Sequence, residues 1–319
     1  MKIKQLISYC LILMLLVACD LLALDVDTDE QNVVETLRVQ PVGDDIIQVG
    51  VLAIRSASAA NAQYGGLIAY LEEELGQPVR LVPVTQEEQF QFVENGKLDF
   101  TINNPLAGVQ IQRLYDTKFL ATLSRPNTGT QFSALIIVRV DSDIQTIEDL
   151  KGVNGTCVAH QTAAAGCNFQ VYHLLQKGIN PYEDFVTFTE TPSQDNIVLG
   201  VQNGTFDVGF IRTGQLEKML RENTIPTLDN IRILDQAEDD FFFPHTTRLY
   251  PEWPFAALAD TDPDLVKQVQ DALLRLDESH PAMQTANASG FVTGVDYTAV
   301  DDLIVELELR SWDTDNRTP

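Results

Sequence analysis

The sequence predicts an α/β protein of two lobes, each built on a doubly wound sheet with flanking helices. Apolar segments of strand length alternate with segments of helical periodicity from residue 46 onward. The alternation runs in two successive series, and the segment after them contains one more strand pattern and at least two helices. This order is typical of open sheets covered by helices on both faces. A folded length of about 270 residues suits two such lobes.

The N-terminus has the features of an export signal. Lys2 and Lys4 precede an apolar run at residues 6–17, which is too short to span a bilayer as a folded helix. The run leads into LVAC, which resembles the bacterial lipobox and implies cleavage after residue 18 and lipid attachment to Cys19. Residues 1–18 are therefore interpreted as a lipoprotein signal peptide, and we expect an extracytoplasmic protein anchored to a membrane by its N-terminal lipid.

Residues 19–45 are interpreted as an acidic tether that holds the lobes away from the membrane. Carboxylates recur along this segment with little hydrophobic periodicity. The whole chain carries a formal net charge of −25, so its surface repels nucleic acid, and no nucleic-acid partner is expected. An anionic ligand therefore requires a local cluster of donors that overcomes the field of the whole molecule.

The first series of elements is expected to form lobe 1, residues 46–135. The run IIQVGVLAI at its start is almost continuously apolar, as in a parallel strand that is buried on both faces. A helix is expected at residues 62–75, where Gly76 ends the periodic pattern. The other strands are expected at residues 79–83, 98–103, 120–123 and 133–140, and the other helices at 87–95 and 105–115.

The second series is expected to form lobe 2, residues 136–240, after which residues 241–319 return to complete lobe 1. A helix should begin near Gly166 and end at Gly178. The strands are expected at residues 157–159, 185–189, 208–211 and 231–234, and the other helices at 194–203 and 215–221.

The loop HQTAAAG at residues 160–166 joins a predicted strand to that helix. A helix N-terminus presents backbone N–H groups without partners and a partial positive charge, and both suit an oxyanion. Gln161 and Thr162 are therefore candidate ligand-binding residues. Every βα connection shares this geometry, so a purely structural role for the loop stays open.

Cys157 and Cys167 are the two cysteines that lie beyond the export signal. Outside the cytoplasm their spacing suits a disulfide, although a strand–loop–helix connection can hold two cysteines too far apart. A redox role for free thiols stays open. His160 and His173 stand at the wrong spacing to complete a tetrahedral metal site, and the chain has no CxxC motif. No metal and no cofactor is expected.

Four segments carry a resemblance to a known family: VLAIRSASAANAQYGGLIAYLEEELGQPVRLVPV, KLDFTINNP, VLGVQNGTFDVGFIRTGQLEKM and HTTRLYPEWPFAAL. They look like the phosphate/phosphonate-type (PhnD-like) periplasmic solute-binding proteins, and the fourth is similar to the branch used as sensor input domains of histidine kinases. The resemblance implies a type II-like periplasmic binding protein fold, in which two lobes clamp a ligand. It also implies two crossovers between the lobes, near residues 133–140 and 241–248.

The loop at residues 160–166 departs from the family pattern. In the family this loop is rich in Ser, Thr and Gly, whereas here only Thr162 offers a hydroxyl among three alanines. A phosphonate would lose side-chain donors worth about 1.5–3 kcal/mol each. The alanines therefore favour a softer, larger or partly apolar anion.

The resemblance and the ends of the predicted strands indicate four more candidate ligand-binding residues. Tyr64 lies where the family has an aromatic residue, although a tyrosine on a helix face also suits packing. Asn104 follows a strand and precedes a proline, so it suits either a ligand donor or a helix N-cap. Arg212 ends a strand and offers a bidentate fork to an oxyanion, or an ion pair to Glu217. Thr246 lies at the second crossover and is expected to face the cleft.

The sequence therefore predicts a lipid-anchored solute-binding protein that captures a small oxyanion, such as phosphate or a phosphonate, for an ABC permease. The alternative is a component that presents a sulfur oxyanion or another anion to a membrane histidine kinase. No GxSxG, HExxH or P-loop pattern is present. An enzyme is not expected.

Overall fold

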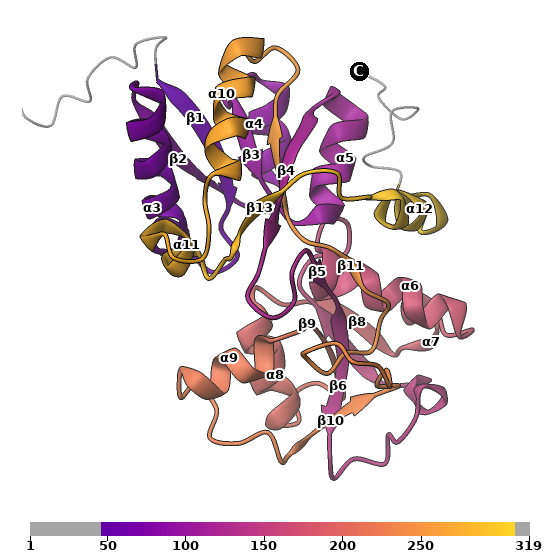
Figure 1. Cartoon of the computed structure of the whole chain (residues 1–319). Helices are drawn as coiled ribbons and strands as arrows, with labels where there is room; N and C mark the ends of the chain where they lie inside the picture. Colours follow the sequence, from indigo (N-terminus) through magenta and orange to yellow (C-terminus); the bar gives the residue numbers. More distant parts are fainter. Residues whose placement is uncertain (1–45, 310–319) are drawn as a thin grey trace, which may run out of the picture. The chain divides into compact units, whose positions relative to one another are not determined.

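Two open β-sheets covered by helices organise residues 46–309, which are the residues that this computed structural model describes (Figure 1). The predicted signal peptide, Cys19 and the tether lie outside the described residues. Within residues 46–309, no helix combines the length and the apolar character that crossing a membrane requires. The predicted fold class, an α/β protein of two lobes, is confirmed.

Lobe 1 contains a six-stranded sheet in the order β13-β4-β12-β3-β1-β2. Strand β1 pairs in parallel with β2 and β3, whereas β12, from the returning segment, runs antiparallel to both β3 and β4. The strands are β1 (Ile47–Leu52), β2 (Val79–Val84), β3 (Phe100–Ile102), β4 (Lys118–Ser124), β12 (Pro254–Ala257) and β13 (Gly290–Val292). The helices are α3 (Ala57–Leu75), α4 (Glu88–Glu94), α5 (Pro105–Tyr115), α10 (Pro263–Leu274) and α11 (Pro281–Ala286).

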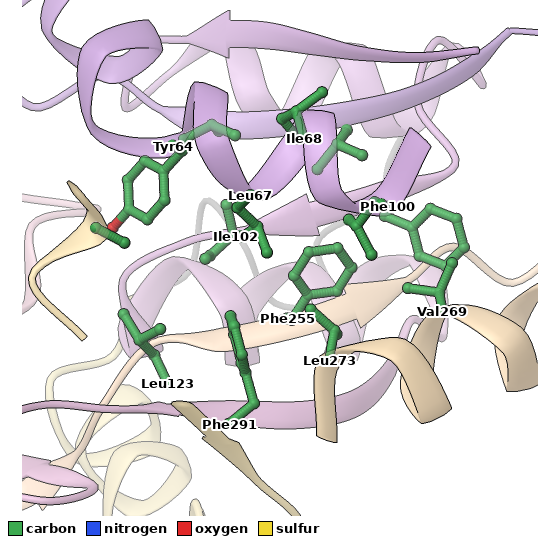
Figure 2. Packing of buried hydrophobic residues seen from close by; sticks show 14 of the residues in the cluster. Tyr64, Leu67, Ile68, Phe100, Ile102, Leu123, Phe255, Val269, Leu273 and Phe291 are labelled. Carbon is green, nitrogen blue, oxygen red and sulfur yellow. The ribbon is translucent and has the colours of Figure 1, made fainter. Parts of the chain in front are cut away.

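The core of lobe 1 lies between this sheet and the helices α3, α10 and α11 (Figure 2). Phe100 and Phe255, on neighbouring strands, bring their ring centroids to 5.8 Å, and both side chains are fully buried. Leu67 of α3 and Leu273 of α10 pack in the same cluster. The alternation of apolar positions along these helices supplies the buried stripe that holds them on the sheet.

Lobe 2 contains a five-stranded sheet in the order β10-β6-β9-β7-β8, in which β7 is parallel to both β8 and β9. Strand β6 is antiparallel to β9 and to β10. The strands are β6 (Ala134–Arg139), β7 (Asn154–Cys157), β8 (Thr187–Glu190), β9 (Val208–Arg212) and β10 (Ile231–Leu234). The helices are η1 (Ile147–Leu150), η2 (Ala164–Asn168), α6 (Phe169–Gln176), α7 (Pro181–Asp184), α8 (Gln194–Gln202) and α9 (Gln215–Arg221).

Two chain segments cross between the lobes, and they meet in a short antiparallel pair formed by β5 (Gln131–Phe132) and β11 (Tyr250–Pro251). The expected first crossover at residues 133–140 is wrong, because residues 134–139 form β6 inside the second sheet. The crossing therefore occurs earlier, between β4 and β6. The buried hydroxyl of Ser133 donates to the carbonyl of Thr247 at 2.6 Å and so ties the two crossovers together.

A last helix, α12 (Thr298–Glu306), packs against both lobes. Its buried residues Val300, Leu303 and Ile304 share one apolar cluster with Leu106 of α5 and Phe169 of α6. Figure 1 shows α12 beside α5 and above α6. The lobes are therefore connected by packing as well as by the two crossovers.

Two predicted boundaries change for identifiable reasons. Helix α3 begins at Ala57 instead of residue 62, because the Ser56 hydroxyl caps it by accepting from the N–H of Ala59 at 3.1 Å. The strand expected at residues 157–159 ends at Cys157, because the N–H of Val158 turns to the carbonyl of Gly166 at 2.9 Å. The helix after it starts with a π-helical turn, η2, which the periodicity of the sequence does not predict.

Candidate functional site

A cavity of about 810 Å³ lies between the lobes. Lobe 1 contributes the first turns of α3 and the turn after β4, and lobe 2 contributes the starts of α8 and α9 and the end of β9. These are mainly the carboxyl ends of strands and the helices that follow them, where ligands sit in open α/β sheets. The volume falls within the range of roughly 300–1,000 Å³ that ligand pockets occupy.

The lining of this cavity carries a charge opposite to that of the whole chain. Five cations and three carboxylates give it a formal excess of +2, against −25 for the protein. An anion inside the cavity therefore meets a local cluster of donors. The charged residues are Arg55, Arg125, Arg212, Lys218, Arg221, Asp195, Glu222 and Glu252.

Arg212 stands at the end of β9, as the sequence predicts, and lines the cavity. Its backbone N–H donates to Oε1 of Gln194 at 2.8 Å, and its Nη1 donates to the carbonyl of Thr213 at 3.2 Å. Among residues 46–309 no carboxylate forms an ion pair with it, so the alternative pairing with Glu217 does not occur there. Burial, followed by repulsion from Arg125, lowers the pKa of the Arg212 guanidinium. Its charge is less compensated than those of Arg55 and Arg125, which both pair with carboxylates.

Arg125 follows β4 in lobe 1 and is held in place by several acceptors. Its Nε lies 3.3 Å from Oε1 of Glu252, and its Nη1 donates to the carbonyls of Ala286 and Asn287 at 3.1 and 3.2 Å. Burial disfavours its charged form, but Glu252 and Tyr64 outweigh that effect and raise the pKa of Arg125. Arg125 is therefore a fixed cation that faces the cavity from lobe 1.

Arg55 links the two lobes across the cavity. It follows β1 in lobe 1, and its Nη2 lies 2.6 Å from Oδ2 of Asp195 and 2.9 Å from Oε2 of Glu222, both in lobe 2. All three side chains are partly exposed, so each pair contributes roughly 0–1 kcal/mol. These ion pairs hold the lobes together only weakly. The binding of a ligand can therefore still shift the equilibrium between open and closed lobes.

Tyr64 lies on α3, lines the cavity and is only 2% exposed. It belongs to the core cluster of lobe 1, and its hydroxyl points away from the other labelled side chains in Figure 2. The packing role considered for Tyr64 is observed, and its contact with a ligand stays a prediction. Its ring packs in the core, and its residue forms part of the cavity wall.

Asn104, Gln161 and Thr162 do not line the cavity. The Asn104 side chain caps α5 by accepting from the N–H of Ala107 at 3.0 Å, and its Nδ2 donates to the carbonyl of Thr162 at 3.2 Å. The carbonyl of Gln161 accepts from Nε2 of Gln110 at 3.1 Å. These contacts join α5 of lobe 1 directly to the loop of lobe 2.

The start of the helix after this loop is covered by apolar packing. Ala164 and Ala165 are 3% and 4% exposed and share a cluster with Leu106 and Val109 of α5. Small apolar side chains at these positions let the helix start sit against lobe 1. The loop at residues 160–166 therefore acts as a contact between the lobes and lies outside the lining of the cavity.

Thr246 also lies away from the cavity. Its hydroxyl donates to the carbonyl of Leu234 at 2.7 Å and accepts from the N–H of Ile136 at 3.2 Å. The side chain is 4% exposed. Thr246 therefore satisfies backbone groups of β10 and β6 and does not face the cleft.

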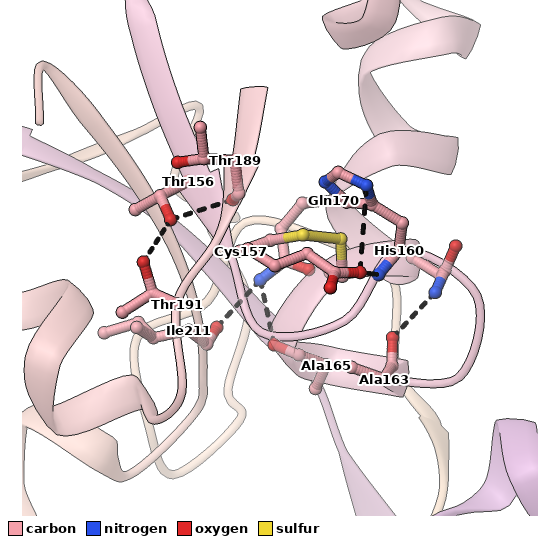
Figure 3. The surroundings of a disulfide bond; sticks show 12 residues. Thr156, Cys157, His160, Ala163, Ala165, Gln170, Thr189, Thr191 and Ile211 are labelled. Carbon is pink, nitrogen blue, oxygen red and sulfur yellow. Dashed lines mark hydrogen bonds and ion pairs between the residues drawn. A yellow bond between two sulfur atoms is a disulfide. The ribbon is translucent and has the colours of Figure 1, made fainter. Parts of the chain in front are cut away.

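Cys157 and Cys167 form a disulfide in the structure, and both residues are fully buried (Figure 3). The bond joins the end of β7 to η2 across the loop at residues 158–166. His160, in this loop, stacks on Phe188 with ring centroids 4.8 Å apart, and its ligand atoms lie within 4.8 Å of both sulfur atoms. Both sulfurs are committed to the disulfide, so this cluster does not present thiolates to a metal.

Sequence reasoning missed Arg125, Glu252 and the start of α8 as parts of the site. Arg125 directly follows a predicted strand, as Arg212 does, so the same strand-end argument applies to it. Gln194 and Asp195 open a helix that was predicted, and a strand of lobe 2 ends nearby. Glu252 follows the second crossover and has no local signal, because its role depends on Arg125, 127 positions away.

Comparison with known proteins identifies what this architecture is similar to. The family model described as "ABC transporter, phosphonate, periplasmic substrate-binding protein" matches residues 49–298. The tetrathionate sensor histidine kinase TtrS of Salmonella typhimurium is 28% identical over 233 residues, which are 70% of this chain and 38% of the kinase. The chain therefore spans well under half the length of this relative.

Solved structures share the fold. PhnD1 of Prochlorococcus marinus in complex with methylphosphonate superposes with a TM-score of 0.69 at 17% identity, covering 83% of this chain and 99% of PhnD1. A protein of Xanthomonas citri bound to ATP gives a TM-score of 0.67 at 18% identity, covering 84% of this chain and 98% of that protein. At these identities the likeness establishes the fold alone.

Proposed function

Because the chain belongs to the family of periplasmic substrate-binding proteins of phosphonate ABC transporters, we propose that it captures a small oxyanion between its lobes and delivers it to an ABC permease. The family is one of extracytoplasmic binding proteins, and we propose no catalytic role. We also propose that a lipid on Cys19 anchors the protein to a membrane. The mass of the mature N-terminus, measured in the membrane fraction, tests that anchor.

The uncompensated charge of Arg212 is the observation that carries this proposal. Arg212 of lobe 2 and Arg125 of lobe 1 both line the cavity, and their charges repel each other. An oxyanion placed between them removes this repulsion and bonds to both lobes. It thereby stabilises the closed form by its differential affinity, and the permease recognises that form.

Replacing Arg212 tests the proposal. Arg212→Gln keeps a polar side chain but removes the charge, and a charge-assisted hydrogen bond is worth about 1.5–3 kcal/mol. We expect the affinity for the anion that binds the wild type to fall about 10- to 100-fold. Isothermal titration calorimetry against phosphate, phosphonates, sulfate, thiosulfate and tetrathionate measures it.

Arg139→Gln is a matched control. Arg212 pairs with Ala134 at the start of β6, because β6 and β9 are antiparallel. Arg139, the last residue of β6, therefore lies at the opposite end of these two strands. This variant should bind like the wild type, and both variants should keep the wild-type melting temperature without ligand to within a few degrees. An unchanged affinity in a folded Arg212→Gln protein would remove Arg212 from the site.

A second candidate function is presentation of a ligand to a membrane histidine kinase. The similarity to the tetrathionate sensor TtrS over 70% of this chain favours it. In this case the ligand would be a sulfur oxyanion, and the same cavity cations would bind it. The titration separates the candidates by ligand: tetrathionate or thiosulfate binding tighter than every phosphonate supports the sensor, and the reverse supports the transporter.

A further inference from the structure

The cavity is larger than a compact oxyanion needs. A water molecule occupies about 30 Å³ in the liquid, so an oxyanion of five heavy atoms fills on the order of 150 Å³. The cavity measures about 810 Å³. Most of it would remain filled with water around phosphate or sulfate, and the nature of the remaining wall therefore indicates what else the ligand carries.

Aromatic side chains are concentrated in that wall. Five of the 29 lining residues are aromatic, about 17%, compared with 8% of the whole chain. Three of them, Tyr64, Phe132 and Trp253, are buried and belong to the scaffold. The other two, Phe242 and Phe243, come from the loop at residues 235–249, between β10 and β11.

Hydrogen bonds of His245 and Asp239 fix the conformation of this loop. The buried His245 contacts the Thr247 carbonyl through Nδ1 at 2.7 Å and Oδ1 of Asp239 through Nε2 at 3.0 Å. The N–H of Phe241 donates to Oδ1 of Asp239 at 3.0 Å, and its ring packs on His245 with centroids 5.3 Å apart. These contacts of Phe241 fix the start of the run of three phenylalanines, although Phe241 itself is only half-buried.

Phe242 and Phe243 are instead presented to the cavity. Their rings meet edge to face, with centroids 4.8 Å apart and an interplanar angle of 84°. Phe242 remains 57% exposed, whereas its neighbour Phe241 is half-buried and packs its ring on His245. A ring left exposed at the wall of a ligand cavity has free surface for a ligand to cover.

Phe243 also lies next to the anion-binding end of β9. A Cβ placed on Gly214 would come within 3.3 Å of two atoms of the Phe243 ring, and Gly214 has a left-handed φ of +73°. Gly214 is two residues after Arg212. A glycine here permits both the turn and the close approach of the ring, so the aromatic pair and the Arg212 guanidinium belong to one region of the wall.

We infer that the ligand is an aromatic oxyanion, with its charged head on Arg212 and Arg125 and its ring against Phe242 and Phe243. This inference rests on the proposed function and specifies its substrate class. A flat ring covers the exposed face of Phe242 and displaces water from the part of the cavity that a compact oxyanion leaves filled. The apolar body adds affinity that does not depend on charge, which suits a protein whose overall field repels anions.

Two probes with the same head group test the inference: phenylphosphonate and methylphosphonate, titrated by calorimetry into the wild type and variants. The wild type should bind phenylphosphonate at least tenfold more tightly. Stacking on one aromatic side chain is worth about three- to tenfold in affinity. Phe242→Leu and Phe243→Leu should each reduce the preference for phenylphosphonate over methylphosphonate by this factor, whereas Phe242→Tyr should retain the preference.

Tyr182→Leu is the control, since Tyr182 is 50% exposed on lobe 2 and does not line the cavity. Equal binding of the two probes by the wild type would overturn the inference and leave the proposed oxyanion site standing. A preference for phenylphosphonate that survives both Phe→Leu substitutions would also overturn it. Failure of the proposed function appears separately, as affinities for both probes that Arg212→Gln does not change.

Discussion

At the scale of the residue, Arg55, Arg125 and Arg212 of the cavity lining differ in how their charges are compensated. Arg55 has two carboxylate partners and Arg125 has Glu252 and two carbonyls, whereas the Arg212 guanidinium has only the Thr213 carbonyl as an acceptor within residues 46–309. A partly buried cation without a counter-ion raises the energy of the ligand-free closed form. If the proposed function holds, an anion at Arg212 supplies the missing counter-charge and so favours closure.

His160 predicts a pH dependence of stability. Burial, only partly offset by Glu190, lowers the pKa of the His160 imidazole below its usual 6.5, and its Nε2 has no hydrogen-bond partner among the described residues. The unfolded chain therefore takes up a proton first as the pH falls, so stability is lost below about 6.5. The melting temperature should fall between pH 7.5 and 5, and His160→Gln should reduce that fall.

His173 changes in the same direction, because burial also lowers its pKa despite Asp235. It remains in both proteins, so the difference between them isolates His160. An identical pH profile for wild type and His160→Gln would contradict the prediction. Comparing the two at pH 7.5, where neither histidine is charged, controls for lost packing on Phe188.

Sequence reasoning at this scale succeeds where a residue's role depends on its own element. Arg212 and Tyr64 line the cavity because the end of β9 and the first turns of α3 place them there. Gln161 and Thr162 do not, because hydrogen bonds from Asn104 and from Gln110 of α5 hold the carbonyls of this loop, and no local pattern in the loop predicts those long-range contacts. Thr246 bonds to strands 12 and 110 positions away, so its orientation could not be read locally.

At the scale of the element, strands and helices with strong periodicity are predicted closely. The helix at Gln215–Arg221 and the strand at Ile231–Leu234 have the expected bounds. The first crossover is predicted in the wrong place, because the apolar pattern of residues 134–139 suits a strand of either sheet. Only pairing with β9 and β10 assigns that strand to lobe 2, and such pairing is a long-range property.

The disulfide between β7 and η2 should stabilise lobe 2. Closing a loop of ten residues restricts the unfolded chain, and such a cross-link contributes about 2–3 kcal/mol to the free energy of unfolding. Replacing both cysteines by alanine should lower the melting temperature by about 4–10 °C for a protein of this size. Differential scanning calorimetry measures the change.

Reduced wild type serves as the companion sample. It lacks the cross-link but keeps both side-chain volumes, so its melting temperature should also fall toward that of the double variant. If the double variant melted at the wild-type temperature under oxidising conditions, the cross-link would contribute nothing to stability.

At the scale of the whole molecule, charge is distributed in two opposing ways. The chain carries −25 overall, yet the cavity lining carries an excess of +2. An approaching anion is repelled at long range and attracted only at contact. Long-range forces are screened by salt, whereas contacts inside a cavity are screened much less.

Association of the anion should therefore become faster as salt is added. Between about 0.01 M and 0.15 M ionic strength the Debye length falls from about 30 Å to about 8 Å, which removes most of the overall repulsion. Stopped-flow fluorescence with the buried Trp253 of the cavity wall as reporter measures the association rate constant. A rate constant that falls with salt would show that the cavity cations dominate the approach.

Helix α12 touches neither Arg125 nor Arg212 among the described contacts, yet its packing bears on how strongly any ligand is held. It buries Val300 and Leu303 in one cluster with side chains of α5 and α6, from different lobes. Separating the lobes must expose part of that cluster to water. The equilibrium between open and closed forms without ligand therefore depends partly on the packing of α12. Substitutions in α12 would then change the affinity for a ligand without changing which ligand the cavity selects.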